Sequence, residues 1–137
     1  MAEDRFAPFL ARAVQFMERV ESALRQDIEQ PDWNSSIAFL YRKRVSGQGY
    51  LVPVRQVGAM RLEDLKEIDV QKEKIQRNTL QFLQGLPANN VLLTGARGTG
   101  KSSLVKACLN TYAAQGLRLI EVDKQDMVDL PDIIDVV

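Results

Sequence analysis

The chain has 137 residues, of which 45% are hydrophobic and 26% are charged, a composition typical of one globular domain rather than of a disordered chain. Eighteen basic residues balance eighteen acidic ones, so the net charge of zero gives no general electrostatic basis for binding nucleic acid or a membrane. With no histidine and one cysteine the chain lacks the ligands of an ordinary zinc site, and because neither a signal peptide nor a bilayer-spanning apolar run is visible, we expect a cytoplasmic protein.

The stretch from Ala7 to Glu29 predicts one amphipathic helix, with Pro31 just beyond its end. Along one side, apolar residues spaced alternately by four and three positions form a seam of the heptad type: Phe6, Leu10, Ala13, Met17, Val20 and Leu24. We expect this seam to pack on the chain's own domain, because three heptads are the minimum for a coiled coil. Assembly of a homo-oligomer through the seam is the alternative.

A β-hairpin is predicted next. Two apolar stretches, 37–45 and 50–57, flank the turn residues 46–49, and Pro53 suits an edge strand. The short basic run Arg42–Arg44 is interpreted as a solvated flank of the hairpin rather than a nucleic-acid patch, because three charges in a neutral chain are a weak footprint.

A second helix is predicted from Asp69 to Gly85. Asp69 is its expected N-cap and Gly85 its expected terminator, with Pro87 following. One side of this helix is expected to carry Ile75, Thr79, Phe82 and Leu86.

Strand and helix then alternate. The apolar run Val91–Thr94 suits a buried parallel strand, a helix is predicted from about Gly100 to Gln115, and Leu117–Val122 predicts another strand. Cys108, on the predicted helix, is expected to be a small core residue. This order favours an α/β fold with a parallel sheet. We therefore expect a helical region with a hairpin at residues 1–60 and a partial nucleotide-binding domain at residues 61–137.

The loop before the helix predicted from about Gly100 carries the phosphate-binding pattern G-x-x-x-x-G-K-[ST]. Residues 95–102 match it at every fixed position, and the predicted strand before and helix after supply the context that the pattern needs. Its glycines permit the positive φ angles with which backbone N–H groups turn inward, and the helix N-terminus adds partial positive charge. The predicted nucleotide contacts are Gly95, Ala96, Arg97, Gly98, Thr99, Gly100, Lys101, Ser102 and Ser103.

Two side chains of the loop are predicted to carry its chemistry. Lys101 is the candidate catalytic residue, because its ammonium group can reach the β and γ phosphates, and the Ser102 hydroxyl is the candidate ligand of Mg²⁺. ATP or ADP with Mg²⁺ is the expected cofactor. A glycine turn with an accidental lysine is the alternative, against which the four fixed positions and both flanking elements argue. Arg97 fills a variable position, where an exposed arginine is expected rather than a phosphate or subunit contact.

Several stretches together resemble a bacterial family of predicted AAA+ ATPases that is filed as a domain of unknown function. The resemblance rests on GLPANNVLLTGARGTGKSSLVKA, GLRLIEVDK, DLPDI and, upstream, MRLEDLKEIDVQKEKIQRNTLQFL, so it covers residues 60–137. It extends more loosely to residues 33–41 and to the LVPVR segment. The resemblance implies that Leu62–Ile68 is the element that contacts adenine, with Ile68 as the contact. Glu67 departs from it, because many AAA+ proteins have glycine there.

The acidic residues that hydrolysis needs are not recognisable. The nearest candidate for four apolar residues followed by Asp-Glu is Leu119–Asp123, which Glu121 interrupts. In AAA+ proteins two further strands separate this strand from the phosphate-loop strand, and they would follow Val137. We therefore interpret the chain as the amino-terminal part of a longer protein, with a truncated sheet. Leu117–Val122 is expected to pair outside its family position, to pair with another chain or to be disordered, because unpaired buried backbone groups cost about 1–3 kcal/mol each.

Three functions fit this pattern. The first is the ATP-binding portion of an AAA+ ATPase, the second is a small-molecule kinase that uses Asp123, and the third is a nucleotide-binding assembly module without turnover. For these 137 residues we expect weak binding of ATP or ADP and no appreciable hydrolysis.

Overall fold

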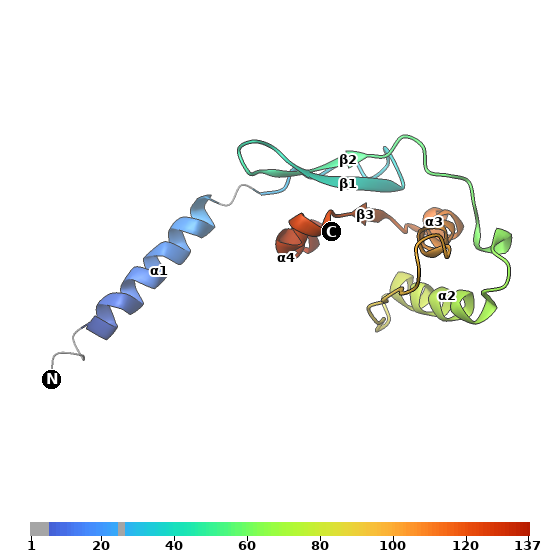
Figure 1. The fold of residues 1–137 in the computed structure, drawn as a ribbon. Coiled ribbons are helices and arrows are strands. Elements are labelled where there is room, and N and C mark those ends of the chain that lie inside the picture. Colours follow the sequence, from blue (N-terminus) through green and yellow to red (C-terminus); the bar gives the residue numbers. More distant parts are fainter. Residues whose placement is uncertain (1–5, 25–26) are drawn as a thin grey trace.

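The computed structural model describes residues 6–24 and 27–137, which form helices and one three-stranded sheet (Figure 1). This combination of helices and a sheet is consistent with the predicted α/β fold. The elements in chain order are α1 (Phe6–Leu24), β1 (Ala38–Lys43), β2 (Gly49–Pro53), η2 (Leu62–Asp64), α2 (Asp69–Leu83), α3 (Lys101–Tyr112), η3 (Ala113–Gln115), β3 (Leu119–Glu121), η4 (Lys124–Asp129) and α4 (Leu130–Ile134).

The predicted hairpin is confirmed. β1 and β2 pair antiparallel with Tyr41 opposite Leu51, and the turn is closed by hydrogen bonds between Arg44 and both Gln48 and Gly47. Gly47 has a φ of 88°, a left-handed conformation that glycine adopts without steric cost. The strand order β2-β1-β3 puts β2, with Pro53 at its end, on an edge of the sheet as expected.

β3 completes the sheet by pairing parallel with β1, with Phe39 opposite Ile120. The predicted strand Leu117–Val122 is therefore present in a shorter form, and pairing within the chain is the outcome observed among the three expected. The sheet is mixed rather than parallel, because β2 runs antiparallel to β1. The sheet also joins the two predicted regions, because β1 and β2 lie within residues 1–60 and β3 lies within residues 61–137.

The sheet carries the first of two hydrophobic clusters, which consists of Ile28, Phe39, Tyr41, Leu51 and Ile133. Ile133 comes from α4, which lies against the sheet (Figure 1). The segment that carries Ile28 was predicted to be helical, and this prediction is wrong. α1 ends at Leu24 rather than Glu29, residues 25–26 lie outside the described chain, and the backbone at Glu29 bridges to Tyr50. This extended course lets Ile28 reach the core, where it is 8% exposed.

The basic run of the hairpin is ion-paired. Lys43 contacts Asp126 and Asp129, Arg42 contacts Asp123, and Arg44 contacts Glu29. The Tyr41 hydroxyl donates a hydrogen bond to Asp129 at 3.2 Å, and burial together with the charge of Asp129 raises the pKa of Tyr41 to about 12. The contacts of Tyr41, Arg42 and Lys43 tie the hairpin to the carboxyl-terminal segment.

The predicted packing of the first helix on its own domain is wrong. α1 stands apart from the sheet and from α2 and α3 (Figure 1), and Phe6, Leu10 and Met17 of its seam are 67%, 58% and 61% exposed. An apolar pattern shows which face of a helix needs a partner, but it does not identify the partner.

α2 differs from the prediction at its start. Its N-cap is Ile68, so Asp69 is the first helical residue instead of the cap. At its end, Gly85 has a φ of 68° and the Leu86 N–H bonds to the Gln81 carbonyl, the Schellman arrangement expected of a glycine terminator. On the predicted apolar side, Ile75, Thr79 and Phe82 line one cavity, and Phe82 and Leu86 are exposed.

The second hydrophobic cluster lies between η2, α2 and α3 and consists of Leu62, Leu104, Ala107, Cys108 and Tyr112. Cys108 is buried there, as predicted; burial raises the pKa of its thiol, while the contact with the Thr79 hydroxyl at 3.3 Å acts in the opposite direction. The segment before α2 is held on α3 by hydrogen bonds from Asn110 to the carbonyls of Gly58 and Met60.

The predicted strand before the phosphate loop is absent. Val91–Thr94 forms no ladder with another described segment, and Leu92 is 86% exposed. A strand needs a neighbour to accept its backbone hydrogen bonds, and here β1 pairs with β2 and β3 instead. Val91 and Leu93 line an apolar cavity of about 450 Å³ bounded by α2, α3 and β3.

Candidate phosphate-binding site

Three glycines shape the loop before α3. Gly95, Gly98 and Gly100 have φ angles of 139°, 84° and 84°, all in the region that favours glycine over residues with a Cβ atom. The sequence pattern requires Gly95 and Gly100, and Gly98 fills one of its variable positions. Residues 95–99 are exposed, so the loop is open to solvent along its length.

The Lys101 side chain folds back over the loop. Its Nζ donates hydrogen bonds to the carbonyls of Gly95 and Ala96 at 2.8 and 2.6 Å and to Thr99 Oγ1 at 3.2 Å. An ammonium group has three donors, and all three are used here within one turn of chain. The loop therefore curves around a single positive charge at its centre.

Thr99 supports this arrangement. The sequence pattern predicted it as a nucleotide contact, but not its hydrogen bond with Lys101. Its hydroxyl donates to the Ala96 carbonyl at 2.8 Å while accepting from Lys101. A Cβ atom added at Gly95 would lie 3.2 Å from Thr99 Oγ1. The first glycine thus leaves room for the hydroxyl that fixes Lys101.

The first turn of α3 offers backbone donors. Gly100 is its N-cap, with no side-chain hydrogen bond, and in the described chain the N–H groups of residues 100–103 have no hydrogen-bond partner. Such unpaired N–H groups and the helix dipole attract anions. Ser102 is exposed and Ser103 half-buried at the same turn, and Arg97 is exposed as expected.

The segment implied to contact adenine lies against α3. Ile68 is half-buried and packs on the cluster that contains Leu104, one helical turn after Lys101. Glu67 has a φ of 64° and is the one non-glycine residue with positive φ in the described ranges. The backbone at this position therefore adopts the conformation that a glycine would favour, although the residue is glutamate.

No carboxylate is brought to the loop by the contacts of the described residues. Asp123, the candidate at the end of β3, pairs with Arg42 at 3.0 Å on the hairpin. Within residues 6–24 and 27–137, no three acidic, histidine or cysteine side chains form a group able to hold a metal ion. Mg²⁺ binding here would depend on Ser102 together with oxygens of a bound nucleotide.

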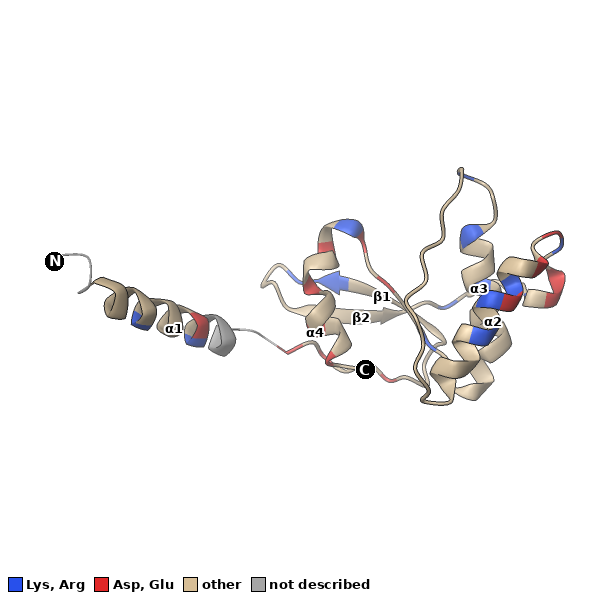
Figure 2. Ribbon diagram, turned by 90° about the horizontal axis from the view of Figure 1, so that it is seen from below, with Lys and Arg blue, Asp and Glu red and all other residues tan. Residues whose placement is uncertain are grey.

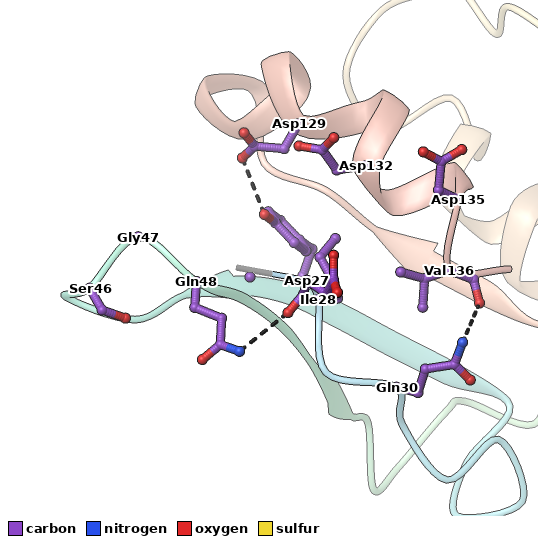
Figure 3. A pocket seen from close by; sticks show the side chains of 12 residues that line it. Asp27, Ile28, Gln30, Ser46, Gly47, Gln48, Asp129, Asp132, Asp135 and Val136 are labelled. Carbon is purple, nitrogen blue, oxygen red and sulfur yellow. Dashed lines mark hydrogen bonds between the residues drawn. The ribbon is translucent and has the colours of Figure 1, made fainter. Parts of the chain in front are cut away.

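A second concave region lies between the hairpin turn and the carboxyl-terminal segment with α4 (Figure 3). This cavity of about 600 Å³ is lined by four aspartates, namely Asp27, Asp129, Asp132 and Asp135, together with Tyr41 and Gln48. Gln48 donates to the Asp27 carbonyl, and Asp129 is engaged by Tyr41 and Lys43. The contacts of Asp129 link the hairpin to the carboxyl-terminal segment at one side of the cavity.

Comparison with known proteins gives a family without an assigned activity. A family model described as "Protein of unknown function (DUF815)" matches residues 34–137, which includes the hairpin as well as the region from residue 60 onward. Neither the curated proteins nor the solved structures contain a significant match. Of the helices described, none has the length and apolar character to cross a membrane.

Proposed function

The chain belongs to the family described as protein of unknown function DUF815, and from this premise we propose that it binds ATP or ADP with Mg²⁺ through residues 95–103, as part of an AAA+ type P-loop ATPase. One observation carries the proposal. The loop with three positive-φ glycines curves around the Lys101 ammonium group at the N-terminus of a helix whose first amides are unpaired. This combination supplies positive charge and converging donors for a phosphate chain.

Each part of the loop has a role in the proposal. The Lys101 ammonium group exchanges its carbonyl partners for phosphate oxygens, a stronger charge-assisted contact. The backbone amides at the start of α3 bind the same phosphates, and the Ser102 hydroxyl joins the Mg²⁺ shell. Gly95 and Thr99 keep the space and the hydrogen bond that orient Lys101. Ile68, carried by the segment packed on α3, would contact the adenine ring.

A bound nucleotide supplies a phosphoanhydride bond, but its hydrolysis needs a carboxylate that orients water or holds Mg²⁺. The contacts of the described residues bring none to the loop, since Asp123 is paired with Arg42. We therefore expect the 137-residue chain to bind nucleotide weakly without turnover. Sustained phosphate release by the purified chain would contradict this expectation.

The kinase alternative gains no support from the same contact, because Asp123 would have to leave Arg42 to act on an acceptor. A module that binds nucleotide without turnover shares the site and differs in the fate of ATP. Turnover that depends on a small acceptor favours a kinase, and turnover without one favours an ATPase.

Calorimetric titration with MgADP tests the binding site. Lys101→Ala removes the central charge, and we expect binding to weaken at least tenfold, since a hydrogen bond to a charged group contributes about 1.5–3 kcal/mol. Lys106→Ala, an exposed lysine on the same helix, is the matched control and should bind like the wild type. Equal affinities for wild type and Lys101→Ala would refute the proposal.

A further inference from the structure

The face of α1 that carries its apolar side chains is uncovered. Three phenylalanines are about two thirds exposed, and four aliphatic or thioether side chains are 38–61% exposed. These residues, which we call the α1 face, are Phe6, Phe9, Leu10, Val14, Phe16, Met17 and Val20. In both views of the molecule α1 extends away from the sheet and from α2 and α3 (Figures 1 and 2). The described chain therefore leaves this face without a partner.

Such a helix depends on a cover for its stability. α1 has 19 residues, not far above the length of roughly 12–15 at which isolated helices are marginal in water. Most helical stability in proteins comes from packing of the amphipathic face. Exposed apolar patches of this kind mark interaction sites.

The spacing of the α1 face fits a second copy of the same helix. Together with Ala13, its central positions Phe6, Leu10, Met17 and Val20 alternate by four and three residues along α1. This is the repeat that lets two identical helices interlock side chains along one seam. A two-fold pair is self-complementary, so one face supplies both halves of the interface.

The exposed area of the α1 face is large enough for such a pair. From the exposed fractions, and with roughly 150–250 Å² for each fully buried aromatic side chain, we expect each copy to contribute roughly 600 Å². Two copies then reach the total of roughly 1,200 Å² at which specific interfaces begin.

The charges of α1 argue against a membrane surface as the cover. Helices that lie on anionic membranes carry an excess of lysine and arginine on the polar side. In α1, Arg12 and Arg19 are balanced by Glu18 and Glu21, and charged positions are sparse along its ribbon (Figure 2). The helix is neutral, so electrostatics adds no attraction to lipid headgroups.

We propose that the α1 face is a self-association surface, covered in solution by α1 of a second copy of this chain. The proposal is independent of nucleotide binding, because it uses no residue of the loop. Copies joined in this way keep their sheets and loops apart from the seam, since α1 projects from the rest of the molecule (Figure 1).

Sedimentation over a wide range of protein concentration tests the proposal. The wild type is expected to have the mass of at least two copies. Leu10→Glu with Met17→Glu places two carboxylates in the seam and should give a monomer. Ala11→Glu with Gln15→Glu adds the same charge on the opposite, exposed side and should keep the wild-type mass. Fluorescence of Trp33, which packs edge-on against Phe39, should be the same in all three proteins and so verifies that the sheet is folded.

A wild type that remains monomeric at every concentration would overturn the proposal, as would a seam variant that keeps the wild-type mass. Co-sedimentation with neutral and phosphatidylserine-containing vesicles adds a separate check. Binding of a monomeric wild type to either vesicle would assign the α1 face to lipid instead of to a second copy.

Discussion

The sheet end and the loop end of the molecule use apolar residues in opposite ways. At the sheet, Phe39 and Tyr41 are 0% and 2% exposed, and three strands exchange backbone hydrogen bonds. At the loop, Leu92 is 86% exposed and Val91–Thr94 has no strand partner. Apolar burial therefore holds the sheet, while the loop itself keeps unpaired backbone donors.

This difference suits a division between scaffold and site. Segments with few buried contacts open most easily, and binding loops are drawn from that class. The loop is still ordered locally, because Lys101 and Thr99 tie it to its own carbonyls. A few polar contacts thus order the loop, whereas apolar burial orders the sheet. Substitutions at the two places can test these contributions separately.

The largest expected effect comes from emptying the sheet core. Phe39→Ala should lower the free energy of unfolding by about 3–5 kcal/mol, because a fully buried ring is lost and a cavity remains. Leu92→Ala, at the exposed strand-like segment, should change it by no more than about 0.5 kcal/mol. Urea unfolding measures both, and a comparable loss in the two variants would show that Val91–Thr94 is packed in solution.

A smaller effect is expected at the hydroxyl that holds Lys101. Thr99→Val removes the hydrogen bonds to Ala96 and Lys101 and should weaken MgADP binding about fivefold, which corresponds to about 1 kcal/mol. Thr99→Ser retains the hydroxyl and should bind like the wild type. Stability of the sheet should be the same in all three proteins. If the serine variant binds as weakly as the valine variant, the hydroxyl does not position Lys101.

A gain in stability is expected at Glu67. Its left-handed backbone disfavours a residue with a Cβ atom, so Glu67→Gly should raise the free energy of unfolding by about 0.5–1 kcal/mol. Glu67→Ala keeps the Cβ atom and serves as the control without a gain. A destabilised glycine variant would mean that the segment before α2 has another backbone conformation in solution.

The last effect is confined to alkaline pH. The pKa of Tyr41 is raised to about 12 by burial and by Asp129, above the ordinary value of 10 for the unfolded chain. The neutral phenol therefore contributes stability below pH 10, and this contribution is lost as the pH rises from 10 to 12. Tyr41→Phe should show a shallower fall of unfolding midpoint over this interval than the wild type. Identical slopes would contradict the buried contact with Asp129.

Local patterns were sufficient where the partner lies nearby in the sequence. The hairpin, the glycine that ends α2 and the helix after the loop were predicted because turn residues and periodicity act over a few positions. Val91–Thr94 shows the limit, since an apolar run satisfies the pattern of a strand without providing a neighbour for its hydrogen bonds. The extended course at Ile28 likewise depends on a core formed with Ile133, which is distant in sequence.

At the candidate site, the sequence pattern identified the glycines, Lys101 and Ser102 by their spacing. Thr99 was predicted as a nucleotide contact, but its hydrogen bond with Lys101 was not, because that bond depends on where the Lys101 side chain turns. The sequence showed that Glu67 stands where many AAA+ proteins have glycine, but it did not predict the positive φ of this residue.

Residue-resolved amide spectra of the wild-type chain during titration with MgADP test the central claim most directly. The account predicts shifts concentrated in the amides of residues 95–103, with the hairpin amides unchanged. Shifts that are absent at saturating nucleotide, or that gather instead around the aspartate-lined cavity, would contradict it.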